Sequence, residues 1–306
     1  MVKNCGRMSK NRHLTAVLLA AVMWGTTGTV AHQAPHGSQQ LVVGMSTFGF
    51  GGLLLFGLDA RSASDVLRQR HLWPLLLLGA GGVVAYASLY YVSMKLVGVA
   101  VGNALALGSG PVWATVFEVL IERRAVARDL VAATLITVAG VILLGTAAHT
   151  GAGQNAVAGV ACALGAGAGY GLYAWAGARL IGRGVTSRGA MAGIFVLGSV
   201  VLVPTLLVIG LGPLTQPSGV VVLVYLAALP MAGAYLLFGY GLRGMAASTA
   251  TTLALAEPVV ATLLATRVLG EHLAPQAWIG LAIIGAGLLL VAVLEHRTAP
   301  QLPDLV

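Results

Sequence analysis

Ten long apolar stretches constrain this chain more than any other feature. They lie at residues 14–31, 41–58, 72–94, 98–121, 130–148, 156–181, 190–211, 220–242, 245–269 and 275–294. Each is long enough to cross a hydrocarbon core of about 30 Å as a helix, which takes about 20 residues. Only 8% of the 306 residues are charged, against about 25% in soluble domains. The sequence therefore predicts an all-α membrane protein with ten transmembrane helices. The runs are continuous rather than alternating, which excludes a β-barrel.

Basic residues are distributed unevenly between the two ends of these spans. With the N-terminus inside, 15 of the 17 Lys and Arg lie on the cytoplasmic side and only two on the other. The positive-inside rule then predicts a multi-pass protein of a bacterial inner membrane. Both tails, 1–13 and 296–306, would be cytoplasmic. This location also explains the net charge of +8 without nucleic acid as a partner.

The two halves of the chain resemble each other. Pro111-Val112 in the fourth span recurs 147 residues later as Pro258-Val259 in the ninth, and Trp24-Gly25 matches Tyr170-Gly171 at nearly the same offset. Five spans per half is an odd number, so the second half must enter the membrane upside down. Inverted repeats with a site at the midplane are an architecture of secondary transporters. We expect a first repeat at 14–148 and a second at 149–295.

Polar residues collect in the first, third, fourth, sixth, eighth and ninth spans, which correspond in pairs under the repeat. The fifth and tenth spans are nearly apolar, and the second and seventh carry little, so we expect these four at the periphery. The six polar spans would surround a central cavity. The candidate substrate-binding residues are Trp24, Thr27, Tyr86, Asn103, Ser109, Tyr170, Tyr173, Tyr235, Thr251 and Glu257.

Glu257 is the most informative of these candidates. A charge at the middle of a span costs at least a few kcal/mol, so it normally faces a bundle interior or a wet cavity. The equivalent position of the first repeat is Gly110, so the acid breaks the symmetry between the halves. The alternative is a structural carboxylate bonded to a neighbouring helix. Glu118, close to the end of the fourth span, is expected to snorkel to the interface.

Other features of these spans have both a structural and a functional interpretation. Pro111 and Pro258 are candidate hinges, or they only kink their helices. The aromatic candidates can pack in the core instead of stacking on a ligand, and Asn103 can join two helices instead of binding substrate. The run GAGAGYG at 165–171 has the small-residue spacing of closely packed membrane helices.

Motifs for metal, nucleotide or covalent chemistry are missing from the sequence. It contains no GxxxxGK[ST] loop, no HExxH and no CxxC, and its two cysteines, Cys5 and Cys162, are far apart. Gly108-Ser109-Gly110 could suggest an intramembrane protease, but all seven histidines lie in tails, connections or span ends. We therefore expect no enzyme activity, no metal and no cofactor.

Several short motifs together resemble a known family. They are WGTTG at 24–28, GPV at 110–112, EPV at 257–259, and a Glu after each of the latter helices, in ERR from Glu122 and in GEHL at Glu271. The set is similar to the EamA-type drug/metabolite transporters, and within them to bacterial amino-acid exporters. The resemblance implies a basket of spans one, three, four, six, eight and nine around a central cavity, with spans five and ten outside.

These observations predict a secondary transporter that exports small metabolites by alternating access. Amino acids with aromatic or other neutral side chains are the expected substrates. Glu257 would bind the amino group, and hydroxyls of Thr27, Thr251 or Ser109 the carboxylate. One alternative is a proton-coupled exporter of cationic compounds with the same fold. Another is a scaffold or accessory subunit that transports nothing. The expected partners are the substrate and the lipid bilayer, and the chain would be a monomer or a homodimer.

Overall fold

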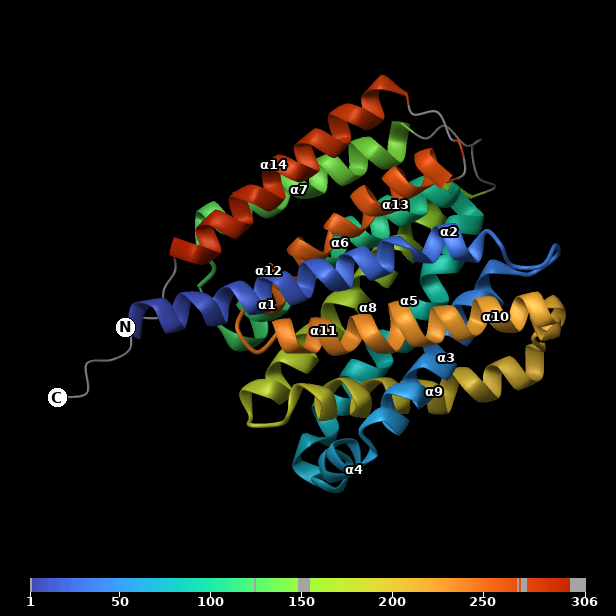
Figure 1. The fold of residues 1–306 in the computed structure, drawn as a ribbon, viewed down its shortest axis with the longest axis horizontal. Helices are drawn as coiled ribbons and strands as arrows, with labels where there is room; N and C mark the ends of the chain where they lie inside the picture. Colours follow the sequence, from blue (N-terminus) through green and yellow to red (C-terminus); the bar gives the residue numbers. More distant parts are fainter. Residues whose placement is uncertain (1, 124, 148–154, 269, 271–273, 298–306) are drawn as a thin grey trace.

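The computed structural model describes residues 2–123, 125–147, 155–268, 270 and 274–297, and shows ten helical spans side by side (Figure 1). The spans of the first half are α1 (Val2–Gly25) with α2 (Thr27–Ala31), α3 (Gln40–Leu58), α5 (Trp73–Val97), α6 (Val99–Glu122) and α7 (Arg128–Ala147). Those of the second half are α8 (Ala156–Gly182), α9 (Ser187–Ile209), α10 (Pro217–Leu226) with η3 (Ala227–Gly233) and α11 (Ala234–Gly241), α12 (Ala247–Ala254) with α13 (Ala256–Val268), and α14 (Pro275–Arg297). Arg124, Glu271 and the expected boundary at 148/149 lie outside the described residues.

Local sequence explains where several helices begin and end. Asn155 and Thr186 precede α8 and α9 and accept hydrogen bonds from the backbone N–H groups of Ala158 and Gly189. Such caps satisfy donors that have no partner within the helix. Gly98 joins α5 to α6 with a φ of 90°. Residues with a side chain rarely adopt this conformation, so a glycine permits the tight reversal between the two spans.

The two halves are inverted relative to each other. The start of α1 and the end of α14 lie at the same end of the bundle, on the left in Figure 1, whereas α7 ends at the opposite end. We call these the termini end and the opposite end. The packing repeats as well: α8 packs against α5 and α6, as α1 packs against α11 and α13, while α3 pairs with α9 and α7 with α14. The prediction of ten helices in two inverted halves is confirmed.

Glycines allow the closest helix contacts in the bundle. A Cβ atom on Gly82 of α5 would lie 2.6 Å from the carbonyl oxygen of Gly169 on α8, and one on Gly169 would lie 2.6 Å from that of Gly82. Gly140 of α7 and Gly280 of α14 face each other in the same way. Lipid tails offer no hydrophobic drive for helix association, so such backbone packing supplies much of the contact energy.

Two parts of the fold differ from the expectation. The second and seventh spans are not merely peripheral, because Phe48 of α3 and Phe195 of α9 pack with the tyrosines of the bundle centre. The connection 59–71 is not a simple loop, because it contains the helix α4 (Ala60–Arg68) and a 3-10 turn, η1 (Arg70–Leu72). Asp59 caps α4 at Ser62, and the helix packs against α9.

Candidate functional site

A cavity of about 810 Å³ lies at the opposite end of the bundle. Its mouth is formed by the connection between α2 and α3, including His32 and His36. Its walls come mainly from α2, α3, α5, α6, α8, η3, α11 and α13, with further residues from α1, α7 and α14. Pockets of about 300–1,000 Å³ hold ligands of drug size. The cavity is therefore large enough for an amino acid or a metabolite several times larger.

Two broken helices cross beside this cavity. The first span is interrupted at Thr26, between α1 and α2, and the ninth at Leu255, between α12 and α13. At the crossing, a Cβ atom on Gly25 would come within 2.6 Å of the Val260 Cβ and 3.1 Å of the Glu257 carbonyl oxygen. Only a glycine permits this approach. Discontinuous helices near the midplane form the binding sites of many secondary transporters.

Glu257 occupies the first turn of α13 and lines the cavity. The side chain is half-buried, and among the described residues its carboxylate has no hydrogen-bond or ion-pair partner. The helix N-terminus carries a partial positive charge, which partly stabilises an acid at this position. The alternative that Glu257 is bonded to a neighbouring helix therefore finds no partner in the described part of the chain. The acid is free to meet a ligand.

Aromatic side chains form the base of the cavity. This aromatic cluster consists of Trp24, Phe48, Tyr86, Tyr170, Tyr173 and Tyr235, which line the cavity, and of Phe195 and Phe238, which are fully buried behind them. Ring centroids are 4.3 Å apart for Phe195 and Tyr235 and 5.0 Å for Trp24 and Tyr235. A buried hydrogen bond of 2.7 Å joins the hydroxyls of Tyr173 on α8 and Tyr235 on α11. Such ring faces can stack on a planar group or attract a cation.

Asn103 and Tyr90 form a polar pair in the cavity wall. The Tyr90 hydroxyl donates to Asn103 Oδ1 over 2.5 Å, and both residues line the cavity. This bond uses the amide oxygen of Asn103. The two N–H groups of the same side chain have no partner among the described residues. They are neutral donors of the kind that can bind a carboxylate. Asn103 therefore joins two helices and also keeps donors for a ligand.

Eight of the ten predicted residues line this cavity, and two do not. Those that do are Trp24, Thr27, Tyr86, Asn103, Tyr170, Tyr173, Tyr235 and Glu257. Thr251 is fully buried and donates to the carbonyls of Ala247 and Ser248 in its own helix. Ser109 donates to the Ala106 carbonyl and faces α8 at Gly167. Their hydroxyls are satisfied by carbonyls of their own helix, which the sequence pattern does not reveal.

The sequence also missed several lining residues. Phe48, Tyr90, Tyr91 and Met231 lie in the cavity wall. Tyr90 and Tyr91 lie four and five residues after the predicted candidate Tyr86 on the third span, so the density of tyrosines was an available signal. The sequence around Phe48 gives no such signal, because a phenylalanine in an apolar span most often packs against neighbouring helices.

The two candidate hinge prolines lie in different local structures. Pro258 lies three residues after the break at Leu255, whereas Pro111 lies inside the continuous helix α6. The shared Pro-Val therefore does not produce the same break in both repeats. A third proline, Pro230, sits in η3, a π-helical segment that also lines the cavity. Wide turns of this kind are frequent at functional sites. Whether any of these positions bends during transport remains a prediction.

No set of three or more His, Cys, Asp or Glu side chains that could hold a metal ion occurs within the described residues. The cavity instead combines one free carboxylate, neutral polar donors and aromatic faces. This arrangement can bind a small organic molecule that carries a positive group.

Comparison with known proteins agrees with the fold and the cavity. The EamA-like transporter family matches residues 12–146 and again 157–293. A protein of Bacillus subtilis (strain 168) described as "Uncharacterized transporter YwfM" is 34% identical over 298 residues, which cover 95% of this chain and 97% of the relative. A solved structure described only as "Crystal structure of protein" has a TM-score of 0.78 at 21% identity, covers 93% of this chain and 98% of its own, and shows the fold alone. With two copies of the family domain in ten membrane-spanning helices, this chain belongs to the EamA-like transporter family.

Proposed function

We propose that this transporter carries small metabolites with an amino group, amino acids first among them, by alternating access. The observation that carries the proposal is Glu257, a carboxylate without a described partner in the wall of an 810 Å³ cavity. Desolvating a charge is costly unless it is paired, so a cation in the cavity is favoured there. The amino group of a substrate supplies such a cation.

Neutral donors in the same wall suit the other groups of an amino acid. The free N–H groups of Asn103 and the hydroxyl of Thr27 can bind the carboxylate. Rings of the aromatic cluster offer apolar faces to the side chain, which favours aromatic and other neutral amino acids. Thr251 and Ser109 are not part of this proposal, because their hydroxyls are bonded within their own helices.

A second candidate substrate class is an organic cation without a carboxylate. The observation that favours it is the absence of Lys and Arg among the described residues that line the cavity. An amino acid would find only neutral donors for its carboxylate, whereas a simple amine needs only Glu257 and the aromatic rings. Exchange of such cations for protons on Glu257 would then couple transport to a proton gradient.

The distribution of basic residues gives the proposed transporter an orientation in the membrane. With both tails in the cytoplasm of a bacterial inner membrane, the cavity opens to the outside, as the releasing state of an exporter does.

A set of three related compounds tests the substrate class in proteoliposomes. Phenylalanine carries both charged groups, phenethylamine lacks the carboxylate, and 3-phenylpropionate lacks the amino group. We expect labelled phenylalanine to exchange, and unlabelled phenethylamine but not 3-phenylpropionate to compete. The proposal is wrong if 3-phenylpropionate competes as well as phenethylamine.

The variant Asn103→Leu separates the two candidate classes. If amino acids are the substrates, this change weakens phenylalanine exchange and leaves competition by phenethylamine unchanged. If amines are the substrates, only phenethylamine is transported by the unsubstituted protein, and its flux follows an imposed proton gradient. Exchange that ignores the gradient indicates an uncoupled facilitator.

A further inference from the structure

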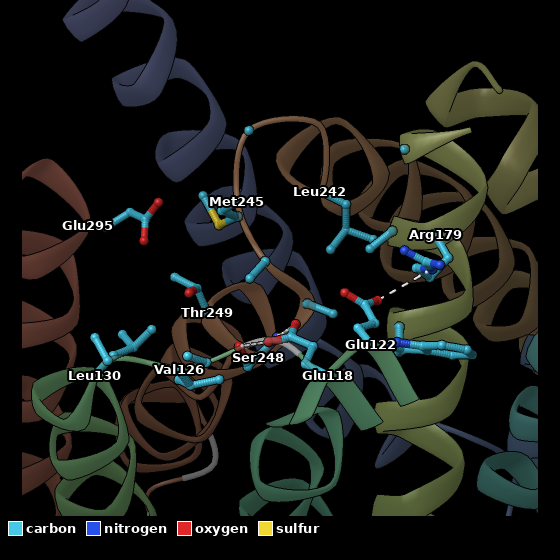
Figure 2. A pocket seen from close by; sticks show the side chains of 18 of the residues that line it. Glu118, Glu122, Val126, Leu130, Arg179, Leu242, Met245, Ser248, Thr249 and Glu295 are labelled. Atoms are coloured by element: carbon cyan, nitrogen blue, oxygen red, sulfur yellow. Dashed lines mark hydrogen bonds and ion pairs between the residues drawn. The ribbon is translucent and has the colours of Figure 1, made fainter. Parts of the chain in front are cut away.

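A second cavity, of about 920 Å³, lies at the termini end (Figure 2). It is lined by the ends of α6, α8 and α14, by the start of α12, and by the connection between α6 and α7. None of its lining residues is shared with the cavity at the opposite end. The protein therefore has two vestibules separated by packed side chains, among them the aromatic cluster. Passage of a substrate requires this partition to open at the termini end.

Glu118 lies at the floor of this second cavity and is bonded to Ser248. Its Oε1 accepts from the Ser248 backbone N–H over 2.9 Å, and its Oε2 accepts from the Ser248 hydroxyl over 2.7 Å (Figure 2). The residue is only 2% exposed, so the expectation that it snorkels to the interface is wrong. Nearby Glu122, in contrast, forms an ion pair with Arg179 at 3.5 Å.

The bonding of Glu118 follows from the start of α12. Ser248 is the second residue of this helix, where backbone N–H groups have no acceptor within the helix. The residue before the helix is Ala246, which offers no side-chain cap. The Glu118 carboxylate on α6 supplies the cap from another helix, and its charge suits the positive helix end. This contact holds α6 of the first repeat to α12 of the second.

The repeat shows that this contact exists at one end only. The offset of 147 residues that aligns Pro111 with Pro258 aligns Glu118 with Ala265 and Ser248 with Val101. An alanine and a valine cannot form the equivalent hydrogen bonds. Ala265 indeed lines the open cavity at the opposite end. In inverted-repeat carriers, each half adopts in one conformation the arrangement that the other half adopts in the alternate conformation. A contact that exists at one end only therefore stabilises one of the two conformations.

We infer that Glu118 and Ser248 form a latch that keeps the termini end closed, so that the conformation open at the opposite end is the resting one. The inference rests on the alternating access proposed above. Glu118 touches no substrate in this arrangement and acts as a positioning residue. To admit substrate at the termini end, α12 must leave α6 and both hydrogen bonds must break.

Accessibility of single cysteines reports this opening without any substrate. The natural Cys5 and Cys162 are first replaced by serine. Ala174→Cys then places a thiol at a fully buried position on α8, the helix that packs against both α6 and α12. Ala265→Cys reports the open cavity, and Ala190→Cys, fully buried on α9 and lining neither cavity, reports general loosening. The reaction rate with a water-soluble maleimide is measured in purified protein in lipid nanodiscs.

Loss of the latch should expose the reporter at Ala174 and spare the one at Ala190. Ser248→Ala removes one hydrogen bond to a carboxylate, and we expect the labelling rate at position 174 to rise roughly tenfold. Glu118→Leu removes both bonds and should raise it further. Glu118→Gln can still accept from the N–H and donate to the hydroxyl, so its rate should stay near that of the parent. Ser46→Ala, which removes a buried hydroxyl without a described partner, is the matched control.

Two results would overturn the inference. One is an unchanged rate at position 174 in both Ser248→Ala and Glu118→Leu. The other is an equal rise at positions 174 and 190, which would show loosened packing rather than a conformational shift. If Glu118→Leu does not fold, Ser248→Ala alone decides. No substrate is added in this experiment. Its result can therefore refute the latch while the proposed substrate class still holds, and the substrate class can be refuted while the latch still holds.

Discussion

The close contact between α5 and α8 predicts how much one added methyl group should lower the stability of the protein. Gly169→Ala would place a Cβ atom 2.6 Å from the Gly82 carbonyl oxygen and 2.9 Å from the Tyr86 backbone nitrogen. Backbone atoms cannot rotate away, so the two helices must separate by roughly half an ångström or more. Overpacking of this kind costs about 1–3 kcal/mol.

The neighbourhood offers a control for this change. Gly81 lies beside Gly82 on α5, is exposed, and has nothing within 4 Å of a Cβ atom. Alanine there relieves the entropic cost of glycine in a helix, so Gly81→Ala should be neutral or stabilising by up to about 1 kcal/mol. At about 2–4 °C per kcal/mol, Gly169→Ala should lower the apparent Tm in detergent by about 2–12 °C.

Thermal unfolding of purified protein, followed by intrinsic tryptophan fluorescence, measures both variants side by side. The packing described for α5 and α8 requires Gly169→Ala to melt below the parent protein and Gly81→Ala not to. Equal melting temperatures of the two variants would show that the helices are not in backbone contact at Gly82 and Gly169.

Two further predictions concern the cavity. Gly25→Ala forces a Cβ atom against the Cβ of Val260 beside Glu257 and should reduce transport. Val260→Gly in the same protein removes that Cβ and should restore part of the transport. A double variant no better than the single one would contradict the crossing of the two broken helices. Tyr173→Phe leaves the buried Tyr235 hydroxyl without its 2.7 Å partner and should lower stability by about 1–2 kcal/mol. Tyr173→Phe with Tyr235→Phe should cost less than the two single losses added together, and strict additivity of the two melting shifts would argue against the bond.

Hydropathy and charge sufficed to predict the spans, because a bilayer permits few alternatives to helices of this length. The repeat and the mid-span acid likewise predicted a central cavity, and Glu257 lies in its wall. Breaks in the helices were harder to foresee. The break at Leu255 has a proline nearby and the π-helical turns of η3 contain Pro230, but the break at Thr26 has no proline, and Pro111 leaves α6 unbroken.

Side-chain partners set the other limit on prediction. Thr251 and Ser109 resemble ligand-binding residues in sequence, yet their hydroxyls bond to carbonyls three or four residues earlier. Glu118 resembles an interfacial acid, yet it is buried against a serine 130 residues further along the chain. Hydropathy registers the depth of a residue in the membrane. It does not register which neighbouring helix it faces.

The central claim is that the Glu257 carboxylate binds the amino group of the substrate. Isothermal titration of the purified protein with phenethylamine tests it most directly, in the parent, in Glu257→Gln and in Asp65→Asn as a control for charge loss at an exposed site on α4. Glutamine keeps the shape and removes the charge, so affinity should fall roughly 10–100-fold in Glu257→Gln and stay unchanged in Asp65→Asn. Equal affinity of the parent and Glu257→Gln, or no binding to the parent at all, would contradict the claim.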